Sequence, residues 1–380
     1  MTALLESISQ RLDELSGRGR ARSLKLPAGV DFCSNDYLGL SRHPAMAQAL
    51  RSALDRRVPV GSGGSRLLRG NQAQHEALEG AAAEFFGSES ALYFNSGFDA
   101  NFALFSTLPS RRDAVIYDAS VHASVREGAR AGLARTFAAR HNDAAAFDKA
   151  IVKARRAGAR GVFLAVESVY SMDGDRAPLA DLLEVARRRD AALFVDEAHA
   201  TGVFGAGGRG LAAGLREPRL ITLHPCGKAL GASGALLAAP AAVTRYLVQA
   251  ARPFLYSTAA SPLMAIVVRH ALKLIDKEPA RRKRLLFLSC QARRMVTEAL
   301  SRWTLLGDRT QILPIVVGGD VEASAAAAFV QSRGFDVRAI RTPTVPGGSA
   351  RLRVNVNVDR TETEIAALVE ILAQAEKRAG

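Results

Sequence analysis

The stretch Ala191-Ala-Leu-Phe-Val-Asp-Glu-Ala-His-Ala200 decides the fold. Its apolar start and abrupt end at Asp196 are typical of a buried strand that finishes on a carboxylate. Short apolar runs of this kind alternate along the chain with helical patterns, and this rhythm predicts an α/β fold with a largely parallel sheet covered on both faces. The expected strands are Ala91–Phe94, Asp113–Tyr117, Arg160–Glu167, Ala191–Asp196, Leu220–Leu223 and Ala235–Leu237, and the helices between them include Gln74–Phe86, Ala144–Arg156 and Pro178–Arg189.

The pattern changes on either side of this region, which predicts three parts. Residues 1–44 form an N-terminal helix and arm, 45–277 a large domain, and 278–380 a smaller α+β domain. In the last part we expect a basic helix over Pro279–Trp303, strands near Ile312–Val317 and Arg351–Val356, and a final helix near Thr361–Arg378.

Composition narrows the function classes. The 380 residues carry 51 Lys and Arg against 37 Asp and Glu, a net charge of +14, which is compatible with nucleic-acid binding. The arginines are dispersed, however, and aromatic residues make up only 6%, so a solvated surface is the better interpretation, with part of the charge available to a polyanionic small substrate. No apolar run is long enough to span a membrane. Three scattered cysteines predict neither disulfides nor a metal site, and favour the cytoplasm.

Two short motifs match signatures of protein classes that the rest of the sequence does not support. Asp196-Glu-Ala-His199 spells the DEAH box of some helicases, but no GxxxxGK[ST] phosphate loop accompanies it. Gly205-Ala-Gly-Gly-Arg-Gly210 matches GxGxxG, yet it does not join a first strand to a helix and no acidic residue follows at the required distance. We interpret the second motif as a loop.

Three residues placed after predicted strands carry the chemistry. These are Asp196, His199 and Lys228, and Lys228 lies among small residues in Cys-Gly-Lys-Ala-Leu-Gly. A lysine that binds the cofactor covalently, with a carboxylate at the ring nitrogen, is the signature of pyridoxal 5'-phosphate (PLP) enzymes. Taken singly, each histidine is more often structural than catalytic.

The phosphate of such a cofactor needs backbone N–H donors at the start of a helix. Ser96-Gly97-Phe98, which opens the helical stretch Asp99–Leu108, can supply them. His122, which follows the strand ending at Tyr117, is placed to stack on the cofactor ring.

The chain resembles the α-oxoamine synthases from Phe32 to Val356. Several blocks in order at matching spacing are more specific than any single motif. They are SNDYLGLSRHP (34–44), GSGGSRLLRG (61–70), NSGFDAN (95–101), VESVYSMDGDRAPL (166–179), VDEAHATGVFGAGGRG (195–210), GKALGASGALL (227–237), FLYSTAASP (254–262) and RTPTVPGGSARLRV (341–354).

The resemblance implies a role for each matching residue. Lys228 holds the cofactor and moves the Cα proton, Asp196 pairs with the ring nitrogen, His199 bonds the phenolic oxygen and His122 stacks on the ring and faces substrate. The further cofactor residues implied are Gly97, Phe98, Ser171 and Thr258. Of these, Thr258 reaches the cofactor phosphate from the neighbouring subunit. The further substrate residues implied are Arg22 (with Arg18 and Arg20 as alternatives), Asn35, Arg341, Thr344 and Arg353.

The resemblance also implies the fold and the reaction. The fold is an aspartate-aminotransferase-like, fold type I large domain with a smaller C-terminal domain, in a homodimer with a shared active site and no nucleic-acid or membrane partner. The final block is most similar to the branch that condenses L-alanine with a pimeloyl thioester, on CoA or a carrier protein, during biotin synthesis. The alternative is a synthase using glycine or serine with another acyl-CoA.

One position departs from the family pattern. The family has Thr or Ser three residues before the lysine, with its hydroxyl on the phosphate, and this chain has Pro225. Proline supplies neither a hydroxyl nor an N–H. Either a neighbour such as His224 or Ser233 compensates, or the cofactor is held more weakly.

Overall fold

The structure is a computed structural model that describes residues 2–215 and 217–379. It comprises two compact units: unit 1 contains the residues up to Ser34, Met172–Asp175 and the residues from Leu285 onward, and unit 2 contains Asn35–Ser171 and Arg176–Arg284. The three-part division at residues 44 and 277 stays a prediction. Within the described residues, no helix combines the length and the apolar character that crossing a bilayer requires.

Unit 2 is built on a seven-stranded sheet. Strand β8 pairs antiparallel with β2 and β7, and all other neighbours pair in parallel. In spatial order the strands are β2 (Ser90–Phe94), β8 (Ala235–Ala239), β7 (Leu220–Pro225), β6 (Ala192–Asp196), β5 (Gly161–Glu167), β3 (Asp113–Asp118) and β4 (Arg135–Ala139).

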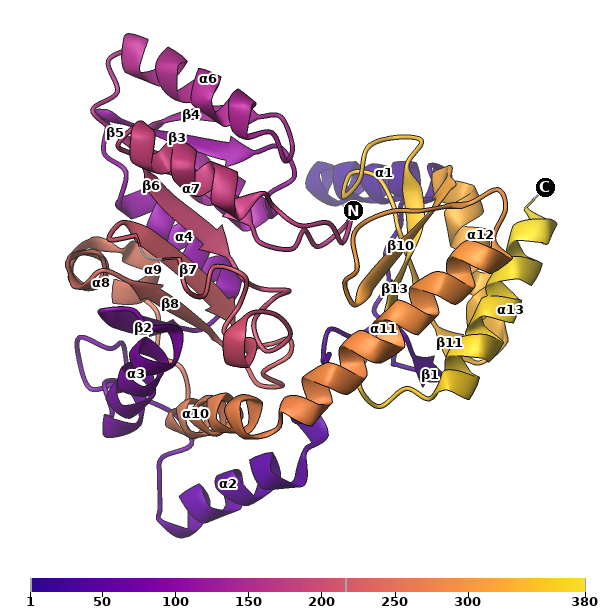
Figure 1. Ribbon diagram of the computed structural model, residues 1–380, viewed down its shortest axis with the longest axis horizontal. Coiled ribbons are helices and arrows are strands. Elements are labelled where there is room, and N and C mark those ends of the chain that lie inside the picture. The colour runs from indigo at the N-terminus through magenta and orange to yellow at the C-terminus, as the bar shows by residue number, and fades with distance from the viewer. Residues whose placement is uncertain (1, 216, 380) are drawn as a thin grey trace. The chain divides into compact units, whose positions relative to one another are not determined.

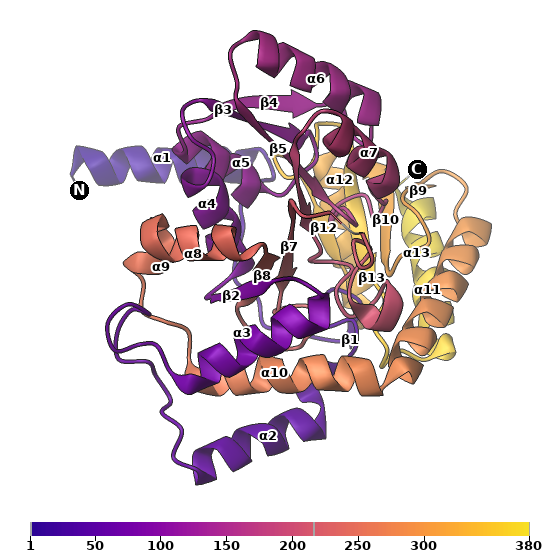
Figure 2. The same cartoon turned by 60° about the vertical axis from the view of Figure 1, so that its left-hand side comes forward.

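Helices cover both faces of this sheet (Figures 1 and 2). Helices α4, α5, α8 and α9 share a buried cluster with one face, and α6 and α7 share another with the opposite face. The helices of unit 2 are α2 (Pro44–Asp55), α3 (Ala73–Phe86), α4 (Gly97–Thr107), α5 (Ala123–Ala131), α6 (Ala144–Arg156), α7 (Leu179–Arg188), α8 (Ala241–Ala250), α9 (Arg252–Leu255) and α10 (Pro262–Lys277), with short 3-10 turns η1 (Leu40–Arg42) and η2 (Ala206–Gly208).

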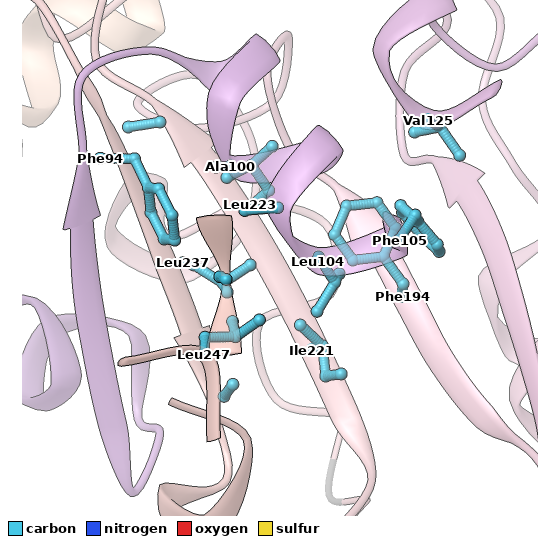
Figure 3. Packing of buried hydrophobic residues seen from close by; sticks show 14 of the residues in the cluster. Phe94, Ala100, Leu104, Phe105, Val125, Phe194, Ile221, Leu223, Leu237 and Leu247 are labelled. Atoms are coloured by element: carbon cyan, nitrogen blue, oxygen red, sulfur yellow. The ribbon is translucent and has the colours of Figure 1, made fainter. Parts of the chain in front are cut away.

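Alternation along each strand distributes its side chains between the two clusters. In β6, Leu193 and Val195 belong to the cluster under α6 and α7, whereas Phe194 belongs to the one under α4. Phe194 meets Phe105 of α4 edge to face at 5.0 Å. Figure 3 shows Leu104 and Phe105 on the side of α4 that faces the strands. Because both faces are buried, the strand reads as one continuous apolar run.

These features confirm the predicted fold class, and each predicted strand of the sheet is present. Strand β4 was not predicted. Its residues Arg135–Ala139 lie at the edge of the sheet and are mostly exposed, so the sequence lacks the apolar run that marks the buried strands.

Unit 1 contains a four-stranded antiparallel sheet and a two-stranded parallel one. The larger sheet has the order β12 (Arg338–Ile340), β13 (Ala350–Asn355), β10 (Ile312–Gly318) and β9 (Thr304–Leu305), and the smaller pairs β1 (Val30–Asp31) with β11 (Phe335–Asp336). The helices are α1 (Ala3–Gly17), α12 (Asp320–Ser332), α13 (Glu362–Arg378) and the part of α11 (Pro279–Ala299) from Leu285 onward.

The GxGxxG segment forms a hydrogen-bonded turn against a buried carboxylate. Glu197 follows β6 and accepts from Ser168 Oγ at 2.5 Å, from the Leu211 N–H at 3.1 Å and from the Ala212 N–H at 2.5 Å. Gly210 has φ +99°, and a Cβ there would lie 2.6 Å from the Glu197 carboxyl carbon. Glycine is therefore required at this position for both conformation and space.

Replacing Gly210 with alanine is expected to lower stability by at least about 2 kcal/mol, because the strained backbone and the clash with Glu197 add. The midpoint of thermal unfolding measures the effect. Gly80→Ala is the matched control, since Gly80 lies within α3 with nothing within 4 Å of the added Cβ. The control should raise stability by roughly 0.5–1 kcal/mol. Equal midpoints for the two variants would contradict the prediction.

Candidate active site

The carboxyl ends of β5, β6 and β7 open onto one cavity of about 410 Å³, which lies wholly within unit 2. Parallel strands present these ends at one edge of a sheet, where ligands of open α/β folds bind. Seven of the predicted site residues line the cavity: Asn35, Gly97, Phe98, His122, Asp196, His199 and Lys228.

Asp196 is the last residue of β6 and is 4% exposed. Asn101 Nδ2 donates to its Oδ2 at 3.0 Å, and the Ala198 N–H donates to its Oδ1 at 3.0 Å. Such donors offset the cost of burying a carboxylate. The arrangement supplies a fixed negative charge that can pair with a protonated ring nitrogen.

His199 is held by a buried tyrosine. Its Nδ1 lies 2.7 Å from Tyr37 Oη, and Tyr37 Oη donates to Asn35 Oδ1 at 3.0 Å. Tyr37 is fully buried, so the phenol fixes the position of the imidazole. This contact joins the block that begins at residue 34 to the one that follows β6.

His122 precedes α5 and caps its N-terminus. Its Nδ1 lies 2.7 Å from Ser124 Oγ and accepts the Ser124 N–H at 3.3 Å. Partial loss of hydration lowers the pKa of His122, nearby Asp196 raises it, and Lys228 and Arg126 lower it. The net shift of the His122 pKa is downward, which favours the neutral ring.

The N-terminus of α4 faces the same cavity. Ser96 is the N-cap: its Oγ accepts the Asp99 N–H at 3.0 Å and donates to Asp99 Oδ2 at 2.9 Å. The first N–H groups of a helix, here those of Gly97 and Phe98, have no partner within the helix and suit an anion. A Cβ on Gly97 would lie 2.9 Å from Cγ of Pro225, so the proline ring packs against this turn.

Lys228 lies in a tight turn between β7 and β8. The turn is closed by backbone bonds from the Cys226 N–H to Gly234 O at 2.8 Å and from the Ala232 N–H to Cys226 O at 2.9 Å. Gly231 has φ +61°, and a Cβ there would lie 2.3 Å from the backbone nitrogen of Ser41. The glycine allows this close approach, and the turn brings the lysine to the cavity.

Two predicted cofactor residues lie in unit 2 but not among the residues that line this cavity. The backbone N–H of Ser171 donates to Glu167 Oε2 at 3.2 Å. Thr258 is exposed, and its carbonyl accepts from Asn95 Nδ2 at 3.0 Å.

The remaining predicted substrate residues lie in unit 1. Arg22 Nη2 donates to Thr344 Oγ1 at 3.5 Å, and Arg341 Nη2 donates to the carbonyl of Ala21 at 3.4 Å. Unit 1 thus brings Arg22, Arg341 and Thr344 together, whereas Arg353 is buried in β13 between Arg338 of β12 and Pro314 of β10. The alternatives Arg18 and Arg20 form ion pairs with Glu14 and Asp320.

Of the two residues considered as substitutes for the missing hydroxyl near the phosphate, only Ser233 lines the cavity. His224 lies instead beside a separate cavity of about 340 Å³. It stacks on Phe86 at 3.5 Å, and its two ring nitrogens meet Thr201 Oγ1 and Thr222 Oγ1, each at 2.8 Å. Burial lowers the pKa of His224 to about 3. Of the alternatives left open by the sequence, compensation by His224 does not fit this geometry, because alternation along β7 directs its side chain away from the cavity that Pro225 lines.

Sequence reasoning assigned no role to three buried residues that line the cavity: Asn101, Ser124 and Glu167. Burial, and secondly the nearby Asp196 charge, raises the pKa of Glu167 to about 8. Its Oε1 has no hydrogen-bond partner within the described chain. The available signal was its position, since Glu167 ends β5 and pairs in register with Asp196 at the end of β6.

Relatives of known kind span nearly the whole chain. The family pattern described as aminotransferase class I and II matches residues 27–372. The 8-amino-7-oxononanoate synthase of Azoarcus sp. (strain BH72) is 42% identical over 394 residues, covering 100% of both chains. That of Methylococcus capsulatus (strain Bath) is 43% identical over 350 residues, covering 91% of this chain and 89% of the relative.

Solved structures show the same fold. A serine palmitoyltransferase variant from S. paucimobilis, solved with a bound PLP–myriocin compound, has a TM-score of 0.89 at 24% identity and covers 100% of both chains. An 8-amino-7-oxononanoate synthase from Francisella tularensis has a TM-score of 0.77 at 26% identity and covers 92% of this chain and 98% of that one. The fold is fold type I. The chain therefore belongs to the aminotransferase class I and II family and, within it, to the group of 8-amino-7-oxononanoate synthases.

Proposed function

We propose that this chain is a PLP-dependent acyltransferase of biotin synthesis. It condenses L-alanine with pimeloyl-CoA, or with pimeloyl carrier protein, and releases 8-amino-7-oxononanoate, the free thiol and CO2. The observation that carries the proposal is the meeting of Lys228, Asp196, His122 and the start of α4 at one cavity of about 410 Å³. Its relatives at about 40% identity bear the name of this activity.

The residues around the cavity fit the cofactor. Its volume of about 410 Å³ lies in the range of small-molecule sites. The residues present match three polar groups of PLP: the Lys228 amine suits the aldehyde, Asp196 the ring nitrogen, and the N–H groups of Gly97 and Phe98 the phosphate. The Ser96 hydroxyl donates to Asp99, so the backbone donors carry the phosphate.

When bound, the cofactor supplies an electron sink for the carbanion formed at Cα of the amino acid. Lys228 Nζ would hold the cofactor and carry the proton removed from Cα. Asp196 would keep the ring nitrogen protonated, His199 would bond the phenolic oxygen, and His122 would stack on the ring. We propose that Asn35, whose Oδ1 accepts a hydrogen bond from Tyr37 Oη, binds the substrate amino acid.

The names of the relatives give the activity, and we add a proposal for the residues that bind the acyl substrate. Arginine suits the terminal carboxylate of a pimeloyl chain and the phosphates of CoA, because a guanidinium binds either in a bidentate manner. Arg22, Arg341, Thr344 and Arg353 of unit 1 are the residues we propose for these contacts. The second candidate is a synthase using glycine or serine, and the likeness to serine palmitoyltransferase at 24% identity supports the fold alone.

We further propose a homodimer in which Thr258 reaches the phosphate bound by the partner subunit. Thr258 is exposed, and Asn95, a cavity residue, binds its carbonyl. Ser171 is proposed to act at the phenolic oxygen. The cytoplasmic location stays a prediction.

A substrate matrix tests the proposed function. L-alanine, glycine and L-serine are each incubated with pimeloyl-CoA or palmitoyl-CoA, and thiol release, CO2 and product mass are measured. We expect product from alanine with pimeloyl-CoA, and none with Lys228→Ala. Borohydride reduction and peptide mapping should locate the cofactor on Lys228. Product from glycine or serine alone would identify the second candidate, and cofactor on another lysine would overturn the site assignment.

Asp196→Asn should retain PLP but lower turnover by several orders of magnitude. A neutral amide cannot hold the ring nitrogen protonated, so the carbanion loses its sink. Absorbance of the bound cofactor and steady-state rates separate retention from catalysis. Turnover close to that of the native enzyme would show that Asp196 is not the ring partner.

Pro225→Thr should tighten PLP binding by roughly threefold to tenfold, because the new hydroxyl can add one hydrogen bond to the phosphate at the start of α4. Pro225→Val is the matched control: it also removes the ring that packs on Gly97, but it adds no hydroxyl. Equilibrium dialysis gives the three dissociation constants. Equal affinity of the threonine and valine variants would mean that the phosphate site gains nothing from a hydroxyl here.

A further inference from the structure

A continuous hydrogen-bond path joins Asp196 to His122 through two side chains without an assigned role. Asn101, on α4, donates from Nδ2 to Asp196 Oδ2 and to Ser124 Oγ, each at 3.0 Å. Ser124, in the first turn of α5, lies 2.7 Å from Nδ1 of His122. Asn101 is 2% exposed and Ser124 is fully buried, so bulk water does not compete for the two bonds that Asn101 donates. The third bond of the path ends on His122, which is exposed.

The direction of each hydrogen follows from the carboxylate. An ionised carboxylate only accepts, so the nitrogen of the Asn101 amide faces Asp196. The same NH2 group has a second hydrogen and no acceptor, so it also donates to Ser124 Oγ. The Asn101 Oδ1 atom has no partner within the described chain, and the two donor contacts alone orient the amide.

The Ser124 hydroxyl, having accepted from Asn101, directs its own hydrogen to Nδ1 of His122. The Ser124 N–H donates to the same atom at 3.3 Å. Two donors therefore meet at Nδ1, which must present its lone pair. The neutral ring then carries its hydrogen on Nε2.

The charged groups near His122 explain why its neutral Nε2–H form suits the site. A protonated His122 would bring a second positive charge close to a cofactor ring that is itself protonated, and like charges at short distance repel. It would also compete with the ring nitrogen for the negative charge of Asp196. The ionisable groups that face His122 are Asp196 of β6, Lys228 after β7, Arg126 of α5 and Glu167 of β5.

We propose that Asn101 and Ser124 are positioning residues that link His122 to Asp196 and hold His122 as the neutral Nε2–H tautomer. The catalytic meaning of this relay rests on the proposed function. The relay itself lies within one chain and can be measured without any substrate.

Ser124→Ala tests the relay, because it removes only the hydroxyl oxygen that contacts His122. The control is Ser120→Ala, which changes an exposed serine two residues before His122. NMR of the histidine-labelled holoenzyme reports the tautomer and pKa of His122, assigned by the signal missing in His122→Asn. We expect Nδ1 to be unprotonated in the native protein. Ser124→Ala should raise the pKa of His122 by roughly half to one pH unit, and Ser120→Ala should leave it unchanged.

Asn101→Ala is the second arm. Without the amide, the Ser124 hydroxyl can turn and accept a hydrogen from Nδ1, so the pKa of His122 should rise here also. The shifts should not add in the double variant, because the amide acts on His122 partly through the hydroxyl. In the active enzyme, the acid limb of the kcat profile should move upward by the shift measured by NMR.

Three outcomes overturn the relay: a hydrogen on Nδ1 in the native protein, a pKa shift in Ser124→Ala no larger than in Ser120→Ala, or additive shifts in the double variant. The same titrations on cofactor-free protein separate this inference from the proposed function. A wrong reaction assignment leaves the His122 tautomer and the pKa shifts as expected, whereas a wrong relay gives one of the three outcomes above and leaves the reaction in place.

Discussion

The buried carboxylate of Asp196 is the constraint on which the site of unit 2 depends. A charge removed from water costs several kcal/mol unless donors meet it. One donor, the Ala198 N–H, comes from the adjoining turn, and the other, Asn101 Nδ2, comes from α4. Leu104 and Phe105 hold α4 on the sheet (Figure 3). The hydrophobic packing that stabilises the fold therefore also delivers the amide and the helix N-terminus to the cavity.

At the ends of β5 and β6, side chains that line the cavity alternate with side chains that stabilise the neighbouring backbone. Glu167 and Asp196 pair in register and line the cavity. The residue that follows each points elsewhere, and Ser168 Oγ donates to Glu197 Oε2 at 2.5 Å. Glu197 also accepts from the backbone N–H groups of Leu211 and Ala212, so it fixes the segment that follows Gly210. A one-residue slip of β6 would exchange the positions of Asp196 and Glu197. Neither carboxylate would then meet the hydrogen-bond donors that it has now.

The sequence allowed the buried strands and the strand-end residues to be predicted because their signals are local. Asp196 follows an apolar run, and Lys228 lies among small residues. Strand β4 gave no such signal. The sequence also could not choose between His224 and Ser233, because proximity to Pro225 in the sequence does not say which face of the sheet a strand residue takes. The contact between Asn101 and Asp196 spans 95 positions. Only the packing of α4 on the sheet brings these two residues together, and no local pattern encodes it.

The charges around the cavity explain why Pro225 can be tolerated. Among the described lining residues, burial raises the pKa of Glu167 to about 8, and the pKa of His122 is lowered. Lys228 is the one lysine among them, and no arginine of the described chain belongs to the lining. A phosphate must therefore be held mainly by oriented N–H dipoles at the start of α4. Because backbone geometry can supply that field, the start of α4 can bind a phosphate without a hydroxyl at position 225.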